Sequence, residues 1–324
     1  FISLIDAFKI VKTEKPDFCH LHDLDLVLII PFLRWLTDVK VIYDSHEAYP
    51  EQIGIREQIP KTLRPFAAWF VNCVEKSSSR LAHHIITADE PTSASFKKYN
   101  MPVETVFNFP DLNSFPTQET ILKHRENSMK SGHKTLVYHG SMCLDRGLLE
   151  MVEAVGILRQ EGFDVSLKLV GHLNNELMEL VNASAKKYQV SDCINLTGWI
   201  EYTRIHQELL TCDFGIVPLQ PNEKYKRNIP IKIFEYMACG IPMIAADLPP
   251  IRRFMDLADC GLIFDSTRPE KLAESVAALI NDPDRYLAMS QNGYDAVLNN
   301  WNWSKMEDVL VSVYKSLKVG KQDT

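Results

Sequence analysis

A lysine and a glutamate lie three positions apart within residues 228–246, a stretch of otherwise mostly apolar side chains. Side chains at positions i and i+3 of a helix are neighbours, so Lys232 and Glu235 would point together toward whatever lies above a sheet. Such a pair presents a cation and a carboxylate to one ligand. The alternative, on spacing alone, is a surface ion pair, which is common and contributes little stability.

The element that positions this pair is predicted to be a helix at 230–239, followed by a buried strand at 243–246. Pro230 suits the first helical turn, because its missing N–H would be unpaired there. Gly240 suits the position after the helix end, where φ is often positive. We expect the apolar side chains of this helix to face the core, and Lys232 and Glu235 to lie off the core face.

A second candidate site is the segment 139–148, which joins a predicted strand to a helix. Gly140 lets the backbone approach a ligand, and the helix start offers N–H groups to an anion. Arg146 adds a fork of donors suited to phosphate. Gly171 and Gly198 follow two further predicted strands, so three strand ends share one rim. The alternative is a set of ordinary turns with a solvated arginine.

Histidines mark the ends of two predicted strands early in the chain. His20 and His22 alternate on one strand, and His46 and Glu47 follow the next. A histidine in a cleft can bond a ligand, although a lone strand histidine is more often a satisfied core residue. The sequence contains no Cys-x-x-Cys and no other ligand spacing, so we expect no metal site.

Composition narrows the classes of protein further. The chain of 324 residues suggests about two domains. Its net charge of −7 argues against a general nucleic-acid binder. The seven cysteines have no paired spacing, which fits a reduced, cytoplasmic compartment. The longest apolar run, 24–36, contains Pro31 and Arg34 and is too short to span a bilayer.

Strands and helices alternate along most of the chain, which predicts an α/β protein with parallel sheets. We expect strands at 18–22, 39–43, 83–87, 104–107, 135–139, 165–170, 194–197, 214–217, 243–246 and 262–264. We expect helices at 1–12, 24–36, 61–81, 91–99, 148–160, 175–188, 202–210, 230–239, 250–257, 269–281, 284–299 and 304–317. Residues 48–60, with two prolines and a glycine, are expected to form a loop. In such sheets ligands bind at the carboxyl ends of the strands.

The alternation is interrupted at residues 109–133, which are polar and include Pro110 and Pro116. We expect a linker here, with one short helix near 121–127. It would join an N-terminal domain at 1–108 to a C-terminal domain at 134–299.

The residues Pro-x-Lys-x-Phe-Glu-Tyr-Met-Ala-x-Gly-x-Pro at 230–242 resemble the donor-site helix of family 4 retaining glycosyltransferases, which have the GT-B fold. The resemblance covers essentially the whole chain and is most specific over 135–265. It implies two Rossmann-like, doubly wound domains facing a cleft, with a last helix within 300–319 that crosses back to the first domain. The chain begins at Phe1, and the first strands of the acceptor-side domain have no counterpart. We therefore expect a fragment with an incomplete first domain.

The resemblance implies a donor site in the second domain. Glu235 would hold the ribose hydroxyls of a nucleotide sugar, and Lys232 would lie near its diphosphate. Ser141 replaces the usual arginine, Arg146 replaces the usual lysine, and Arg227 replaces a usual glutamate that touches the sugar. The implied donor-binding residues are Gly140, Ser141, Arg146, Gly171, Trp199, Asn228, Lys232 and Glu235.

These assignments imply a retaining glycosyltransferase that moves a sugar from a UDP- or GDP-linked donor to a glycan or lipid-linked acceptor. Arg146 and Lys232 would stabilise the leaving diphosphate instead of a metal ion, and no further cofactor is expected. His22 would bond the transferred sugar, and His46 and Glu47 would lie on the acceptor side. Two alternatives stay open: a GT-B sugar-nucleotide epimerase, and a non-catalytic nucleotide-sugar-binding subunit.

The resemblance also implies a setting, polysaccharide or glycolipid assembly at the cytoplasmic face of the inner membrane. The predicted helix 61–81 combines basic residues with Phe66, Trp69 and Phe70. The basic residues are Lys61, Arg64, Lys76 and Arg80. This combination indicates either a peripheral contact with a membrane surface or a core helix with a basic outer side. No nucleic-acid partner is expected.

Overall fold

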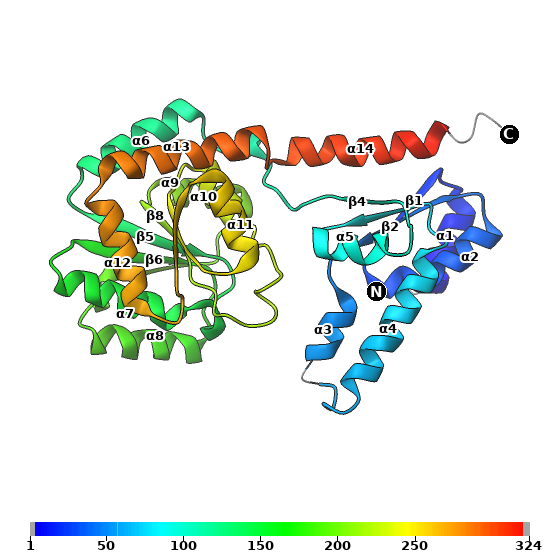
Figure 1. Ribbon diagram of the computed structural model, residues 1–324, viewed down its shortest axis with the longest axis horizontal. Helices are drawn as coiled ribbons and strands as arrows, with labels where there is room; N and C mark the ends of the chain where they lie inside the picture. The colour runs from blue at the N-terminus through cyan, green and yellow to red at the C-terminus, as the bar shows by residue number, and fades with distance from the viewer. Residues whose placement is uncertain (1–3, 57, 320–324) are drawn as a thin grey trace. The chain divides into compact units, whose positions relative to one another are not determined.

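The computed structural model describes residues 4–56 and 58–319, which fall into two compact α/β units (Figure 1). The first unit combines the chain up to Asn108 with the chain from Ser304 onward, and the second unit is Phe109–Trp303. Each unit contains one parallel sheet, as the alternating pattern predicts.

The first unit is built on a four-stranded sheet in the order β1-β2-β3-β4. Its strands are β1 (Phe18–His22), β2 (Lys40–Ser45), β3 (His84–Thr87) and β4 (Val103–Thr105). Its helices are α1 (Leu4–Glu14), η1 (Leu24–Ile29), α2 (Ile30–Leu36), α3 (Tyr49–Ile55), α4 (Arg64–Ser79), α5 (Glu90–Lys97) and α14 (Trp303–Val319).

Alternation along β2 gives this sheet two covered faces. Ile42 and Ile86 pack against Val313 of α14. Val41 and Tyr43, which point the opposite way, belong to the cluster that includes the buried residues of η1 and α2. Successive side chains of a strand alternate between the two faces of its sheet, so the C-terminal helix and the early helices cover opposite sides.

The second unit is built on a six-stranded sheet in the order β10-β9-β8-β5-β6-β7. Its strands are β5 (Lys134–His139), β6 (Val165–Val170), β7 (Ile194–Gly198), β8 (Phe214–Val217), β9 (Met243–Ala246) and β10 (Gly261–Phe264). Its helices are η2 (Leu112–Ser114), α6 (Gln118–Lys130), η3 (Leu144–Arg146), α7 (Leu148–Gln160), α8 (Asn175–Lys187), η4 (Ser191–Cys193), η5 (Tyr202–Arg204), α9 (Ile205–Leu210), α10 (Lys232–Ala238), α11 (Pro249–Ala258), α12 (Pro269–Ile280) and α13 (Pro283–Asn299). The strand order reverses next to β5, and ligands of such sheets bind outside the carboxyl ends of strands at this point.

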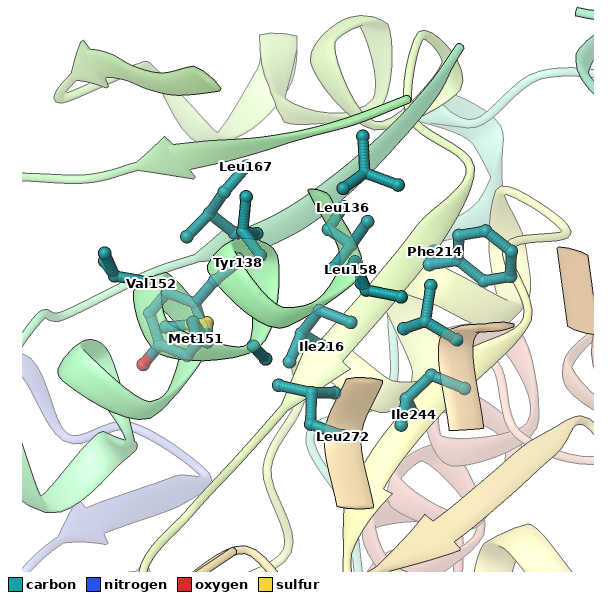
Figure 2. Packing of buried hydrophobic residues seen from close by; sticks show 14 of the residues in the cluster. Leu136, Tyr138, Met151, Val152, Leu158, Leu167, Phe214, Ile216, Ile244 and Leu272 are labelled. Atoms are coloured by element: carbon teal, nitrogen blue, oxygen red, sulfur yellow. The ribbon is translucent and has the colours of Figure 1, made fainter. Parts of the chain in front are cut away.

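Figure 2 shows the core on one side of this sheet, where strand residues meet the buried faces of α7 and α12. Leu136, Ile216 and Ile244 come from three neighbouring strands, and Leu158 and Leu272 come from the two helices. The strands read as continuous apolar runs because parallel sheets are covered on both faces.

The stretch around α10 folds as predicted. The strand expected at 243–246 is β9, and the helix expected at 230–239 is the shorter α10, which begins after Pro230. Gly240 has a φ of +56°, and a Cβ on it would lie 2.4 Å from Cγ2 of Ile121. A glycine is therefore required at this helix end, both for its φ and for the close approach of Ile121.

Two expected elements differ from the structure, and proline explains both differences. Residues 24–36 form η1 and then α2 instead of one helix, because Pro31 cannot donate a hydrogen bond to the preceding turn. Residues 48–60, expected to be a loop, contain α3. Pro50 lies in its first turn, where a missing N–H costs nothing.

The segment 109–133, expected to be a linker, is part of the second unit and contains α6, which runs beside α13 (Figure 1). Ile121 and Arg125 are buried on one side of α6. The Arg125 guanidinium donates to the backbone oxygen of Leu210 at 3.0 Å and also to that of Cys212. Composition cannot distinguish a buried arginine that donates to carbonyl groups from an arginine on a polar surface. The polar composition of this segment therefore indicated a linker.

Candidate functional site

Three neighbouring strands of the second sheet, β5, β6 and β7, each end at or just before a glycine, and backbone hydrogen bonds link these strand ends. The N–H of Gly140 donates to Val170 O at 2.9 Å, and the N–H of Gly171 donates to Gly198 O at 2.9 Å. A Cβ on Gly171 would lie 2.2 Å from Gly140 O, and its φ is +153°. Only glycine fits this position. The carboxyl edges of β5, β6 and β7 are therefore held close together, as the strand-end glycines indicated.

A group of titratable residues, which we call the lysine cluster, surrounds the end of β5 and the start of α10. Its members are Tyr138, His139, Arg146, Lys232 and Glu235. The Lys232 side chain is buried, and its Nζ lies 3.5 Å from the centroid of the Tyr138 ring. A Cβ on Gly140 would lie 3.7 Å from the same Nζ. The ammonium group thus faces the glycine loop after β5.

The Nζ of Lys232 has no hydrogen-bond partner among the described residues. Burial lowers the pKa of Lys232 well below its usual value, and the positive charge of Arg146 lowers it further. A buried ammonium without a partner is costly unless an anion meets it. The position therefore offers a ready partner for a negatively charged ligand.

Arg146 supplies a second cation next to the same tyrosine. It lies in η3, half-buried, and its Nε donates to the Tyr225 hydroxyl at 3.2 Å. Burial raises the pKa of Tyr138 to about 12, against the opposing effect of Arg146. Burial raises the pKa of Tyr225 to about 12 as well. Both phenols therefore stay neutral, and neither cancels the charge of the guanidinium.

Glu235 lies on the other side of the lysine cluster, with 4% of its surface exposed. Its Oε2 is 3.3 Å from Nε2 of His139. Burial lowers the pKa of His139 far below its usual value, so the ring is neutral and this contact is not an ion pair. Burial also raises the pKa of Glu235 to about 7, against the effects of a hydrogen bond from Tyr202 and of the charge on Lys232.

The expectation that Lys232 and Glu235 lie off the core face is wrong, because every residue of α10 is buried. On one side Tyr236 donates its hydroxyl proton to Val137 O of β5 at 3.1 Å. On the other side the Phe234 ring meets the Trp301 ring at 5.9 Å. The helix is covered all round, so its two charged side chains are surrounded by protein instead of by solvent.

The remaining predicted donor residues are more exposed. Ser141 is exposed, and its backbone oxygen accepts from the Tyr138 hydroxyl at 2.9 Å. Trp199 follows β7 and exposes 74% of its surface. Asn228 and Arg227 are exposed in the loop before α10, where the N–H of Asn228 donates to Lys224 O at 3.1 Å.

Sequence reasoning missed His139, Tyr202 and Tyr225 as members of this site. His139 is the last residue of β5 before Gly140, so its place at a strand end was a usable signal. Tyr202 and Tyr225 reach the site from segments that carry no motif, and only the fold brings their hydroxyl groups to Glu235 and Arg146.

A second group, which we call the histidine cluster, lies in the first unit at the carboxyl ends of β1 and β2. Its members are His20, His22, Asp44 and His46. Ring nitrogens of the three histidines approach one oxygen, Asp44 Oδ2, at 3.3, 3.4 and 3.5 Å respectively. His22 Nδ1 also lies 3.0 Å from His46 Nε2.

Strand pairing creates this cluster. His22 and Asp44 are register partners on β1 and β2, and His20 lies two residues before His22 on the same side of its strand. The structure therefore brings together His22 and His46, as the sequence-based hypothesis needs, together with His20 of the same strand. It adds Asp44, which the sequence analysis did not single out. Glu47 is exposed beside the cluster.

The family Glycosyl transferases group 1 matches residues 120–296, which is more than half of the chain and includes the lysine cluster. The chain belongs to this family. The family expected from residues 230–242 is thereby confirmed, and so is the α/β fold class with two parallel sheets.

Similar proteins include two curated glycosyltransferases. Alpha-D-kanosaminyltransferase of Streptomyces kanamyceticus is 21% identical over 261 residues, covering 78% of this chain and 64% of that protein. A GDP-mannose-dependent alpha-(1-6)-phosphatidylinositol monomannoside mannosyltransferase of Mycobacterium tuberculosis is 24% identical over 172 residues, covering 51% of this chain and 44% of that protein. The matched part thus spans about half to two thirds of these relatives.

Solved structures show the same fold at low sequence identity. Anabaena Alr3699/HepE in complex with UDP has a TM-score of 0.75 at 14% identity, covering 96% of this chain and 82% of that chain. Sucrose-phosphate synthase from Thermosynechococcus elongatus has a TM-score of 0.74 at 16% identity, covering 98% of this chain and 77% of that chain.

Among the described residues, no helix combines the length and apolar character that crossing a bilayer requires.

Proposed function

We propose that the protein is a retaining glycosyltransferase that moves a sugar from a nucleotide diphosphate sugar to a glycan or lipid-linked acceptor. One observation carries this proposal: the buried Nζ of Lys232 has no hydrogen-bond partner among the described residues and faces the glycine loop after β5. A diphosphate fits this position, because Arg146 adds a second cation and the glycines leave its oxygens room to approach. The UDP bound to HepE and the GDP-mannose used by the mycobacterial relative support a UDP- or GDP-linked donor.

Lys232 and Arg146 would act on the leaving group. Negative charge builds on the diphosphate as the sugar leaves, so fixed cations in a buried site stabilise the transition state more than the ground state. Glu235, in its ionised form, would accept hydrogen bonds from the ribose hydroxyl groups of the donor. This division of roles needs no metal ion in the transfer step.

The histidine cluster would provide the side chains of the first unit that contact the sugar and the acceptor. We assign His22 to the transferred sugar, and His46 and Glu47 to the acceptor. His22 and His46 expose 54% and 38% of their side chains, so both can be reached by a ligand. Burial lowers the pKa of His22, with the neighbouring His20 acting in the same direction, which favours a neutral ring that can both donate and accept.

Donor titration followed by a transfer assay tests this function. The full-length protein is titrated calorimetrically with UDP, GDP and their glucose and mannose conjugates, and each donor that binds is incubated with and without candidate acceptors. Donor consumption that needs an acceptor supports transfer. Acceptor-free release of sugar or a 2-epimer indicates the epimerase, and binding without consumption indicates the binding subunit. Failure to bind any of these nucleotides would show that the proposal is wrong.

We also propose that α4 contacts the surface of an anionic membrane on its cytoplasmic side. Phe66, Trp69 and Phe70 expose 65%, 59% and 54% of their surfaces along one side of α4. The expectation of a core helix with a basic outer side is wrong here. The side of α4 that faces the sheet is polar, because Glu75 accepts hydrogen bonds from Tyr43 and Ser45.

The basic residues near α4 divide into two pairs. Lys61 is exposed and Arg64 half-exposed, both next to the aromatic stripe. Lys76 is buried and donates to Ser95 Oγ at 2.8 Å, and Arg80 stacks on the Tyr99 ring at 4.8 Å. Aromatic rings flanked by cations suit the interface of an anionic bilayer.

Vesicle sedimentation tests this contact. The protein should pellet with vesicles that contain phosphatidylserine and stay in solution with phosphatidylcholine alone. Phe66→Ser with Trp69→Ser should abolish pelleting. Leu257→Ser, which changes a side chain of the second unit that is 70% exposed, should not. Equal pelleting of the two variants would contradict the assignment to α4.

A further inference from the structure

We propose that the histidine cluster is a binding site for a transition-metal dication such as Zn²⁺, with His20, His22 and Asp44 as its core ligands and His46 as a fourth. Imidazole nitrogens together with one carboxylate oxygen are the ligand set that Zn²⁺ favours. Magnesium and calcium prefer oxygen ligands alone, so the chemistry of the cluster selects the transition ions. The proposed transfer reaction does not require this ion.

The distances within the cluster match those of a coordination shell. Zinc binds imidazole nitrogen and carboxylate oxygen at about 2.0–2.1 Å, so ligand atoms at tetrahedral positions lie about 3.3–3.4 Å apart. The three histidine nitrogens lie 3.3, 3.4 and 3.5 Å from Asp44 Oδ2. One pair of nitrogens, from His22 and His46, is 3.0 Å apart. The ligand atoms of His20, His22 and Asp44 all lie within 4.8 Å of one another, so small rotations of the rings would complete the shell.

His20 is held in the orientation of a metal ligand. Its Nδ1 lies 2.8 Å from the Tyr314 hydroxyl of α14, which fixes the ring with Nε2 directed at Asp44. This Nε2 is buried and makes no hydrogen bond to any described residue. Histidines that bind metal characteristically use their other ring nitrogen in a hydrogen bond of this kind. An ion bound between His20 and Asp44 would give this buried nitrogen a partner.

The cluster is closed on one side and open on the other. The side chains of His20 and Asp44 expose 17% and 12% of their surfaces, whereas His22 and His46 expose 54% and 38%. An ion can therefore enter from the side of His22 and His46 and be held against the buried pair.

Coordination would occupy the same nitrogens that the proposed function assigns to the transferred sugar and the acceptor. A bound ion should therefore inhibit transfer, and this consequence alone rests on the proposed function. Metal binding itself needs no donor, so the two hypotheses can fail separately.

Metal titration tests the site. Chelator-treated protein is titrated with Zn²⁺ by calorimetry and with Co²⁺ by absorption spectroscopy. We expect saturable binding of Zn²⁺ and the intense visible bands of tetrahedral Co²⁺. His22→Ala should abolish these bands. Tyr314→Phe keeps all four ligands but removes the support of His20, and should weaken binding about 10–100-fold.

His133→Ala is the matched control, because His133 forms a comparable pair with Asp164 in the second unit, with Nδ1 and Oδ2 3.2 Å apart. This variant should bind both metals like the unaltered protein, and circular dichroism should show that all variants are folded. The proposal is overturned if neither ion binds, or if His22→Ala and His133→Ala behave alike. If Zn²⁺ binds at the cluster without slowing transfer, the site stands and the roles of His22 and His46 in transfer are wrong.

Discussion

The lysine cluster of the second unit and the histidine cluster of the first occupy equivalent places, the carboxyl ends of parallel strands, yet they offer opposite partners to a ligand. Lys232 and Arg146 present positive charge, and the ammonium is buried without a hydrogen-bond partner among the described residues. His20 and His22 present nitrogen lone pairs around the Asp44 carboxylate. The first arrangement attracts an anion and the second a cation. The topology supplies the location, and the residue types decide which ligand it serves.

Burial is the second difference between the clusters. Lys232 and Glu235 expose 7% and 4% of their surfaces, whereas the His22 side chain exposes 54%. In a buried site the surroundings shift pKa values and strengthen each charge interaction. Substitutions in the lysine cluster should therefore have large effects on the proposed transfer reaction, and pH should act mainly there.

The largest effect is expected for the two cations. Lys232→Met and Arg146→Ala should each lower kcat about 10²–10³-fold, because each removes a cation that stabilises the extra negative charge that builds on the diphosphate as the sugar leaves. Arg146→Lys should recover part of this loss, since the charge is kept but the fork geometry is lost. Steady-state kinetics of the full-length protein measure the effect. Lys226→Ala, which breaks an exposed pair with Glu223, is the control, and near-normal kcat in the first two variants would remove both residues from the mechanism.

Glu235 should affect donor affinity instead. Glu235→Gln keeps the shape of the side chain and removes its charge, and it should weaken donor binding by about 1.5–3 kcal/mol, the range for hydrogen bonds to a charged group. This corresponds to roughly 10–150-fold in Kd. Calorimetric titration with the nucleotide checks it, and thermal unfolding controls for stability because the residue is buried. An unchanged Kd would contradict the ribose assignment.

The pKa of Glu235, about 7, predicts how donor affinity depends on pH. Only the ionised carboxylate accepts from both ribose hydroxyl groups, and below pH 7 an increasing share of the free protein carries the proton. Affinity should therefore fall as pH drops below about 7, by up to about tenfold per pH unit. Titrations between pH 5.5 and 8.5, on the order of half a unit apart, resolve this slope. Protonation of the nucleotide affects the pH dependence of donor affinity equally in the unaltered protein and in Glu235→Gln. If Glu235→Gln shows the same slope as the unaltered protein, Glu235 is not the source of the slope.

A smaller effect, an uptake of protons, should accompany binding at Lys232. Burial and Arg146 lower the pKa of the free lysine, and a diphosphate beside it restores the charged form, so binding should take up protons. Above pH 8 the carboxyl of Glu235 is ionised already and contributes little. Calorimetry in buffers of different ionisation enthalpy measures the uptake. If Lys232→Met takes up as many protons as the unaltered protein, the lysine does not face the diphosphate.

The smallest expected effect is that of chelation, which should leave transfer unchanged. The two cations of the lysine cluster meet the diphosphate charge, and the metal site proposed for the histidine cluster takes no part in the reaction. Full-length activity in excess EDTA should therefore equal or exceed that without it. Loss of activity that magnesium or manganese restores would overturn the metal-free transfer step. It would also mean that the lysine cluster does not meet the diphosphate charge without a metal ion.

The sequence predicted those helices and strands whose residue patterns lie within a short stretch of the chain. The strands expected at 165–170, 214–217 and 243–246 are β6, β8 and β9, because strands buried on both faces are short apolar runs ended by glycine, proline or polar residues. The pair Lys232 and Glu235 was accessible for the same reason, since helix geometry alone relates residues three apart. The family was indicated by a different signal, the resemblance of residues 230–242 to a known donor-site helix.

Only the tertiary structure determined the contacts between residues that are far apart in the sequence. Pairing of β1 with β2 places Asp44 among histidines that precede and follow it in the sequence, and no spacing rule relates these residues. Helix α10 is buried because other parts of the second unit pack on both of its sides. In α4 the side with Glu75 faces the sheet and forms hydrogen bonds, so the aromatic side is the exposed one. Residue type and periodicity act over a few positions along the chain, whereas burial, pKa and ligand geometry depend on neighbours that only folding brings together.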